Sequence, residues 1–259
     1  MNSLRRLRGG VLPVLGVLAW WWCAHYYPAR SPLLVTPESV VNTAWQMAAS
    51  GQLWRALSAS LARELAGFTL GASGGLILGY LLGQFRGFAL VVGGSFNTFK
   101  QVSLFAWIPL ISVWFGLTDT AKVVFLSLAA LVPVTVHTWD GLRQLPPALE
   151  EVTRTLCLTR SQTFWSLQLP AALPTIFTGL YLSLIYSWLA TIGAEYLLVS
   201  GEGIGNTLID GSEHFRMDLV LTGMVVIGLV GWLLNASARY LEQRLARRFG
   251  YQQRSKELI

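Results

Sequence analysis

Long runs of apolar residues separated by short polar intervals account for most of this chain. A membrane-spanning helix needs about 20 mostly apolar residues, and several runs approach that length. They are Val11 to Tyr27, Leu61 to Gln84, Val102 to Leu117, Val123 to Trp139, Ile176 to Val199 and Leu219 to Ala236. The pattern therefore predicts an all-α, polytopic membrane protein with about six transmembrane helices.

Two stretches between these runs favour helices that do not cross the bilayer. A short amphipathic helix is expected at the outer surface, from apolar residues at helical spacing: Val40, Val41, Ala44, Trp45 and Ala48. The segment Phe88 to Phe99 could add a re-entrant or interfacial helix. Composition agrees with a membrane location, since only 12% of the 259 residues are charged, whereas soluble domains carry roughly a quarter.

Arginines at both ends of the chain orient the helices. The net charge is +6, and the basic residues flank the first and last apolar runs: Arg5, Arg6, Arg8, Arg239, Arg244, Arg247, Arg248 and Arg254. Neither cluster is interleaved with the aromatic residues that single-stranded nucleic acid requires, so lipid and not nucleic acid is the expected neighbour. The positive-inside rule then places both termini in the cytoplasm.

The predicted helices and the basic C-terminal flank divide the chain into three parts. An N-terminal helix with an outer segment occupies 1–60, a permeation core 61–237, and a basic cytoplasmic tail 238–259. Counting helices from the cytoplasmic N-terminus places the longest polar interval, 143–170, on the cytoplasmic side. The interval Ser200 to Asp218, with four acidic residues and one arginine, lies outside.

Glycine recurs every fourth residue in the second apolar run, at Gly67, Gly71, Gly75, Gly79 and Gly83. Residues four apart share one helix face, and small residues there let a second helix approach closely in lipid. The alternative, a loose glycine-rich linker, is disfavoured because the intervening residues include Leu, Ile, Phe and Tyr. The stripe predicts the tightest helix contact of the protein.

Motifs for enzymatic chemistry are missing from the sequence. It has no G-x-x-x-x-G-K-[ST] motif for nucleotide phosphates. Its histidines, His25, His137 and His214, lie on different segments, unlike metal ligands. Cys23 and Cys157 are expected on opposite sides of the membrane, where they cannot pair. We therefore expect a non-catalytic subunit with no cofactor of its own.

The cytoplasmic interval carries the most specific pattern. Apolar Val152, Leu156, Phe164 and Leu167 alternate with charged Glu151 and Arg154, which predicts short amphipathic helices broken between Cys157 and Ser161. An exposed helix of this kind suits docking into a groove of a partner protein.

This interval resembles the E-A-A, Gly, I-x-L-P loop of binding-protein-dependent ABC importer permeases. The spacing of five positions carries the likeness: Glu151, the position of Cys157, Leu167, Leu169 and Pro170. Leu104 to Gly116, with its A-W-I-P-L and W-F-G pieces, is similar to the nitrate, sulfonate and taurine branch, as are Ala62 to Phe68 and Ser200 to Gly205. The likeness runs from about Leu53 to the C-terminus.

The resemblance implies a type I, MetI-like permease fold in a bacterial inner membrane. It also implies a homodimer, two cytoplasmic ATPase subunits that bind ATP-Mg, and an extracytoplasmic binding protein that delivers a small anion such as sulfonate, taurine or nitrate. The residues that it assigns to the ATPase-coupling loop are Glu151, Arg154, Leu156, Cys157, Leu158, Leu167 and Pro170. Glu151 and Arg154 would form a polar rim and Leu156 and Leu158 the buried contact, unless this is simply a solvated helix face.

The sequence departs from the family pattern at several positions. Val152 and Thr153 replace the two alanines, and His137 stands where the branch has asparagine. Cys157 stands where the family has glycine. Glycine reaches positive φ at no steric cost, so a cysteine there means either a differently shaped turn or strain of about 1 kcal/mol or more.

Glu195 is the acidic residue within the apolar stretch Ile192 to Val199. An intramembrane carboxylate usually faces the bundle interior or a watery path, so we expect a gate or helix-packing role, paired with Ser, Thr or Arg. The alternative is a carboxylate solvated at the outer interface. Gln101, Lys100, Trp107 and His137 are further candidates for the pathway.

Two other classes stay open at this point. A secondary transporter or channel not coupled to ATP would show internal repeats, and broken helices with ionisable residues at the midplane. A membrane enzyme would show acidic or histidine residues clustered at one interface. The sequence predicts none of these features, and an importer permease is favoured.

Overall fold

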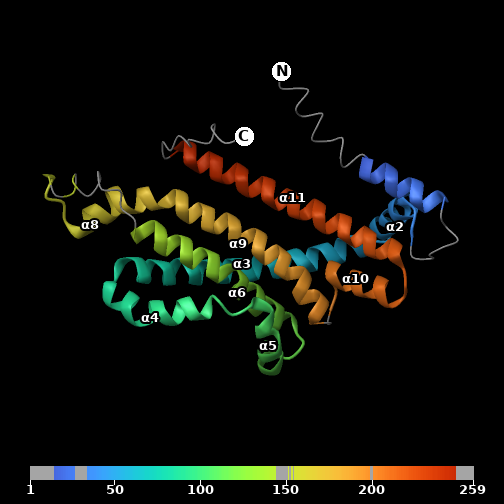
Figure 1. Ribbon diagram of the computed structural model, residues 1–259, viewed down its shortest axis with the longest axis horizontal. Helices are drawn as coiled ribbons and strands as arrows, with labels where there is room; N and C mark the ends of the chain where they lie inside the picture. Colours follow the sequence, from blue (N-terminus) through green and yellow to red (C-terminus); the bar gives the residue numbers. More distant parts are fainter. Residues whose placement is uncertain are drawn as a thin grey trace, which may run out of the picture. The chain divides into compact units, whose positions relative to one another are not determined.

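The computed structural model describes residues 15–26, 34–143, 151, 153, 155–198 and 201–248, without the side chains of 243 and 245–248. Every regular element within these residues is helical (Figure 1). The chain divides into two compact units, the first formed by Met1–Ala59 and Glu202–Gly228, and the second by Ser60–Gly201 and Leu229–Ile259. The boundaries predicted at 60 and 237 stay predictions.

Four described helices are long and apolar enough to cross a membrane. They are α3 (Gln52–Gln84), α6 (Asp119–Arg143), the continuous helix Arg160–Leu197 that contains α8 and α9, and α11 (Met217–Arg248). A bent pair of helices brings the number to five if it counts as one span. The first predicted span is helical over 15–26, and its remainder lies outside the described residues. The prediction of a polytopic helical membrane protein is confirmed.

One predicted span is wrong in its form, because Val102 to Leu117 does not cross the membrane alone. A 3-10 turn, η1 (Leu104–Trp107), leads into α5 (Ile108–Phe115), which has only eight residues. Pro109 lies in the first turn of this short helix, and Gly116, with a φ of +68°, ends it. Together with α4 (Arg86–Phe99), it forms the bent pair, with an angle of 94° at the break.

The glycine stripe of α3 packs against α6, as the sequence predicted for a tight contact. A Cβ placed on these glycines would collide with α6 at positions that also advance in steps of four: Leu126, Ala130, Val134, Thr138 and Leu142. Both series rise along the chain, so α3 and α6 run parallel (Figure 1). This contact fixes the register of the two helices.

Helix α9 (Leu169–Leu197) runs antiparallel to α6 in the same unit. Gly141 faces Thr175 at one end, and His137 lies against Gly179 one turn further. Nearer the other end, buried apolar residues of α5, α6, α9 and the C-cap of α9 form a shared core: Ile111, Ala121, Phe125, Leu126, Ala129, Ala190, Ala194 and Leu198. The second unit is thus a bundle organised around α6.

The first unit contains the short amphipathic helix expected at the outer surface. This helix, α2 (Pro37–Ala49), begins at Thr36, whose hydroxyl accepts from the Ser39 amide. Two bonds join α2 to the start of α11: Thr43 Oγ1 donates to Asp218 at 2.8 Å, and Thr222 Oγ1 donates to the Val40 carbonyl at 3.2 Å. Helix α10 (Ile204–Glu213) completes this unit.

Candidate functional site

The predicted coupling loop contains a sharp helix end at Cys157. Residues 151, 153 and 155 are helical, and the amide of Leu158 donates to the Thr153 carbonyl at 3.1 Å. Cys157 has a φ of +49°, in the left-handed region. This is the Schellman arrangement, whose left-handed position is usually glycine. Of the two alternatives for Cys157, the structure has a glycine-like turn occupied by a strained cysteine.

Replacing Cys157 with glycine is expected to stabilise the protein, because glycine adopts this backbone without a Cβ clash. The gain should be about 1 kcal/mol, or a rise of roughly 2–4 °C in the melting midpoint in detergent. Cys157→Ala is the matched control, since alanine keeps the Cβ and the strain. Equal midpoints for the glycine and alanine variants would contradict this account of the turn.

The second half of the loop is built as the start of a long helix. Thr159 and Gln162 form a reciprocal capping box that begins α8 (Arg160–Thr163). A π-helical turn, η2 (Phe164–Gln168), connects α8 to α9 without a break. Pro170 lacks an amide hydrogen and its ring crowds the carbonyl of residue 166, which accounts for the wider turn. The capped end of the loop is therefore continuous with a spanning helix.

Gln168 ties this helix to its neighbours. Its Nε2 donates to the Leu142 carbonyl at the end of α6 at 2.6 Å, and its Oε1 accepts from Gln84 at the end of α3 at 2.8 Å. Phe164 and Leu169 also pack on the buried cluster of Leu142, Ala172 and Ile176. Gln168 was not among the predicted site residues, although it occupies the x position of the I-x-L-P motif.

The exposed surface of the loop is partly apolar. Leu156 is 63% exposed and Trp165 66% exposed, and Glu151 and Cys157 are also exposed. Leu158, Leu167 and Pro170 are half-buried. Arg154 lies outside the described residues. Exposed large apolar side chains such as Leu156 and Trp165 suit a protein contact.

Glu195 lies in a buried ionic cluster at the other end of the bundle. It is fully buried and accepts from Ser60 at 2.7 Å and from Arg63, partners of the types expected. Arg63 also pairs with Asp119 at 2.9 Å, and the Lys122 ammonium lies 3.8 Å from the same carboxylate. The cluster joins α3, α6 and α9, and a carboxylate solvated at the interface is not what the structure shows.

A second buried carboxylate, Glu64, lies one residue along α3. Its two oxygens accept from the hydroxyls of Ser187 and Thr191 on α9. Arg63, Glu64 and Lys122 were not predicted from the sequence to belong to a buried polar cluster. Its available signal was the adjacent Arg63 and Glu64 inside a long apolar run.

The other residues predicted to lie on the pathway do not share one site. Trp107 lines a cavity at the break between α4 and α5, together with Lys100, and Gln101 is exposed beside it. His137 is half-buried against Gly179, and neither it nor Glu195 lines that cavity. The sequence predicted no helix broken at an ionisable residue. The break beside Lys100 shows that this prediction was wrong.

Comparisons with known proteins agree with this geometry. Residues 73–251 match the family described as binding-protein-dependent transport system inner membrane component. The chain is 35% identical over 241 residues to the putative aliphatic sulfonates transport permease protein SsuC of Escherichia coli (strain K12), covering 93% of this chain and 91% of that protein. It is 30% identical to the nitrate import permease protein NrtB of Leptolyngbya laminosa, covering 94% and 89%.

A solved structure shares the fold. The inward-facing MetNI methionine ABC transporter matches with a TM-score of 0.61, 22% sequence identity, and coverage of 76% of this chain and 96% of that chain. The expectation of a MetI-like permease fold is confirmed.

Proposed function

This chain belongs to the family of binding-protein-dependent transport system inner membrane components, and from this we propose how it takes part in transport. It is the transmembrane permease subunit of an ABC importer. Two copies form a homodimer, and each contributes to the pathway for a small anion such as sulfonate, taurine or nitrate. An extracytoplasmic binding protein delivers that anion.

Two cytoplasmic ATPase subunits bind ATP-Mg and accept the coupling loop. The observation that carries this proposal is the unbroken helix from Arg160 to Leu197. Because this helix is rigid, a displacement of its capped cytoplasmic end would be transmitted past Gln168 to the buried cluster at Glu195. Leu156 supplies the apolar contact to the ATPase, and Glu151 its polar rim.

The orientation follows from the basic flanks of the chain. Both termini lie in the cytoplasm, the coupling loop lies beneath a bacterial inner membrane, and α10 lies outside.

Reversing the charge of Glu151 should disconnect the permease from its ATPase. In the variant Glu151→Arg, the ATPase should no longer copurify in mild detergent, and uptake should fall by about tenfold or more. The reason is that the proposed polar contact of the Glu151 carboxylate with the ATPase is replaced by a cation, which would repel a cationic partner or stay unpaired in the interface. Glu213→Arg is the matched control, since Glu213 is an exposed carboxylate at the end of α10. The proposal fails if the wild-type protein never brings down an ATPase and Glu151→Arg leaves uptake intact.

A further inference from the structure

Three arginines lie at the end of the bundle that carries the coupling loop. Arg86 begins α4, Arg143 ends α6 and Arg160 begins α8. Arg86 and Arg160 line one cavity of about 1150 Å³, and Arg86 and Arg143 line a second of about 740 Å³. The two cavities adjoin, since Gln84, Arg86 and Gln168 line both. The second cavity, bounded by Arg86, Arg143 and one face of α4, is called the arginine groove below.

The charge of these arginines is not balanced by the residues around them. All three side chains are exposed, and the ion pairs among the described residues include none of them. Among the described residues that line the two cavities, none is Asp or Glu, and Asp140, exposed one turn before Arg143, lines neither. Arg86 also lies at the positive end of the α4 dipole, where a cation is unfavourable and an anion is favourable. An anionic group beside Arg86 would offset both effects.

The uncharged polar groups at this end already bond one another. The Gln84 side chain donates to Gln168 at 2.8 Å, and Gln168 donates to the Leu142 carbonyl at 2.6 Å. The guanidinium groups are therefore the donors that this end of the arginine groove presents to a ligand.

Deeper in the membrane, the arginine groove becomes apolar. At 1.5 Å per residue, the stretch of α4 from Arg86 to Gly94 is about 12 Å long, slightly less than the ~15 Å half-thickness of the hydrocarbon core. A Cβ on Gly94 would meet nothing within 4 Å, so the wall is open there, and Asn97 ends the apolar stretch one turn deeper. A cationic end followed by an apolar channel of this length matches a phospholipid headgroup and the upper part of one acyl chain. The residues that line the apolar stretch are Ala89, Leu90, Gly93, Gly94, Trp139 and Leu142.

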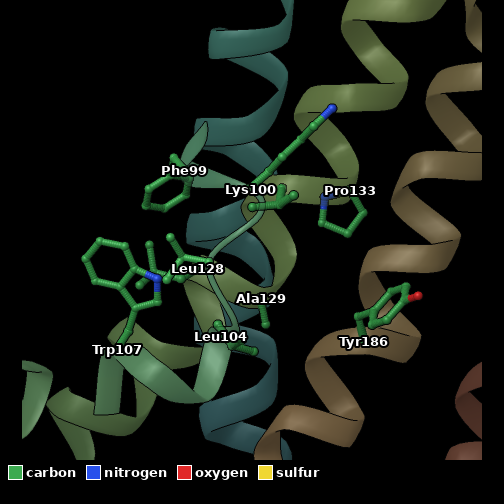
Figure 2. Close-up of a pocket in the computed structure, with 10 residues that line it drawn as sticks. Phe99, Lys100, Leu104, Trp107, Leu128, Ala129, Pro133 and Tyr186 are labelled. Atoms are coloured by element: carbon green, nitrogen blue, oxygen red, sulfur yellow. The ribbon is translucent and has the colours of Figure 1, made fainter. Parts of the chain in front are cut away.

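The other end of α4 does not provide a second place for the anionic group. Lys100 caps α4 beside a cavity with apolar and aromatic walls. Figure 2 shows the Lys100 side chain extending past Pro133, away from the rings of Phe99 and Trp107. Because its ammonium is not aimed into that cavity, the arginines are the place for the headgroup.

We propose that the arginine groove binds an anionic phospholipid, such as phosphatidylglycerol. Arg86 and Arg143 bind its phosphate, Arg160 adds to the positive field, and one acyl chain lies along α4 over Gly93 and Gly94. The planar guanidinium suits this role, because it binds phosphate through two parallel N–H bonds. Basic pockets between spanning helices are also known sites for anionic headgroups. The inference goes beyond the proposed transport function and does not depend on it.

Two other anionic occupants fit the arginine groove less well. Free inorganic phosphate would pair with the arginines but would leave the apolar stretch uncovered. An acidic surface of the ATPase could reach Arg160 beside the coupling loop, but Gly94 lies about 12 Å further along α4 than Arg86, inside the membrane. A lipid is the occupant that covers both parts.

Binding of radiolabelled dioleoyl phosphatidylglycerol to the purified permease and ATPase complex in mild detergent tests the site. We expect saturable binding, which Arg86→Gln and Arg143→Gln should each weaken by about tenfold or more, as for the loss of one charged hydrogen bond. Gly94→Trp fills the apolar stretch from an exposed position that has room for a Cβ, and should weaken binding to a similar extent.

Two matched controls should bind the lipid like the wild type. Val91→Trp places the same bulk on α4 at a 78% exposed position outside both cavities. Arg55→Gln removes an exposed arginine that lines neither cavity.

Competitors separate the contribution of the headgroup from that of the acyl chain. Unlabelled phosphatidylglycerol should compete, phosphatidylcholine with the same acyl chains should compete about tenfold less well, and inorganic phosphate at the same concentration should not compete. The proposal is overturned if either of these competes as well as phosphatidylglycerol, if the complex shows no saturable binding, or if the arginine and Gly94→Trp variants bind like the wild type. Binding that appears only after the ATPase or a second permease copy is removed would also overturn it, because protein would then cover the groove.

Discussion

Replacing both Gly71 and Gly75 with alanine should prevent α3 from packing against α6, and the protein should lose most of its stability. A Cβ on Gly75 would lie 2.8 Å from the Leu131 carbonyl oxygen and 2.8 Å from Val134 Cβ. A Cβ on Gly71 would collide with the Ser127 carbonyl oxygen. The obstacles are backbone atoms that cannot rotate away, so we expect a cost of about 3 kcal/mol or more for the pair.

The matched control is the glycine next to this stripe. A Cβ on Gly74 meets only Leu131 Cδ1, at an ordinary distance of 3.5 Å. Gly74→Ala should therefore be neutral or gain up to about 1 kcal/mol from better helix propensity. Thermal unfolding in detergent, followed by size-exclusion chromatography, measures both. A double variant as stable as Gly74→Ala would refute the parallel contact of α3 and α6.

Removing the carboxylate of Glu195 should destabilise the bundle by a similar amount. The Arg63 guanidinium would lose its buried partner while the pair with Asp119, a side chain that is 63% exposed, would remain, and the bond from the Ser60 hydroxyl to this carboxylate would be lost. Breaking a buried pair by removing one partner costs about 3–5 kcal/mol, because a charge remains uncompensated. We expect this loss for Glu195→Ala, measured as the melting midpoint in detergent.

Two comparisons isolate the buried charge. Glu195→Gln keeps an oxygen acceptor for Ser60 and should fall between the alanine variant and the wild type. Glu202→Ala removes an ion pair with Arg55 in which both side chains are over 60% exposed, so it should change stability by no more than about 1 kcal/mol. If Glu195→Ala and Glu202→Ala lowered the melting midpoint equally, the buried ionic cluster would contribute no more to stability than an exposed ion pair.

The sequence predicted the glycine stripe because helical spacing alone places these residues on one face. The sequence did not identify α6 as the partner, because residue spacing shows which face of a helix is small but not which helix packs on it. The same limit applies to Glu195: its apolar surroundings indicated burial, whereas Arg63 lies 132 residues away in the chain. Long-range pairing depends on how helices cross, which no local pattern records.

The break at Lys100 was missed for a different reason. The run Val102 to Leu117 has no charged side chain and is nearly long enough to span, so hydropathy predicted one helix. Pro109 and Gly116 were the available signals of a short helix, and their meaning depends on the neighbouring α4. Cys157 is a different case: the family's glycine at this position left a differently shaped turn and a strained cysteine as alternatives, and the positive φ of Cys157 selects the second.

Uptake of a radiolabelled alkanesulfonate into vesicles that contain the permease, its ATPase and the binding protein tests the central claim most directly. An importer permease predicts that uptake needs ATP on the ATPase side and that it persists when proton and sodium gradients are collapsed. Uptake that proceeds without ATP and stops when those gradients are collapsed would contradict the account.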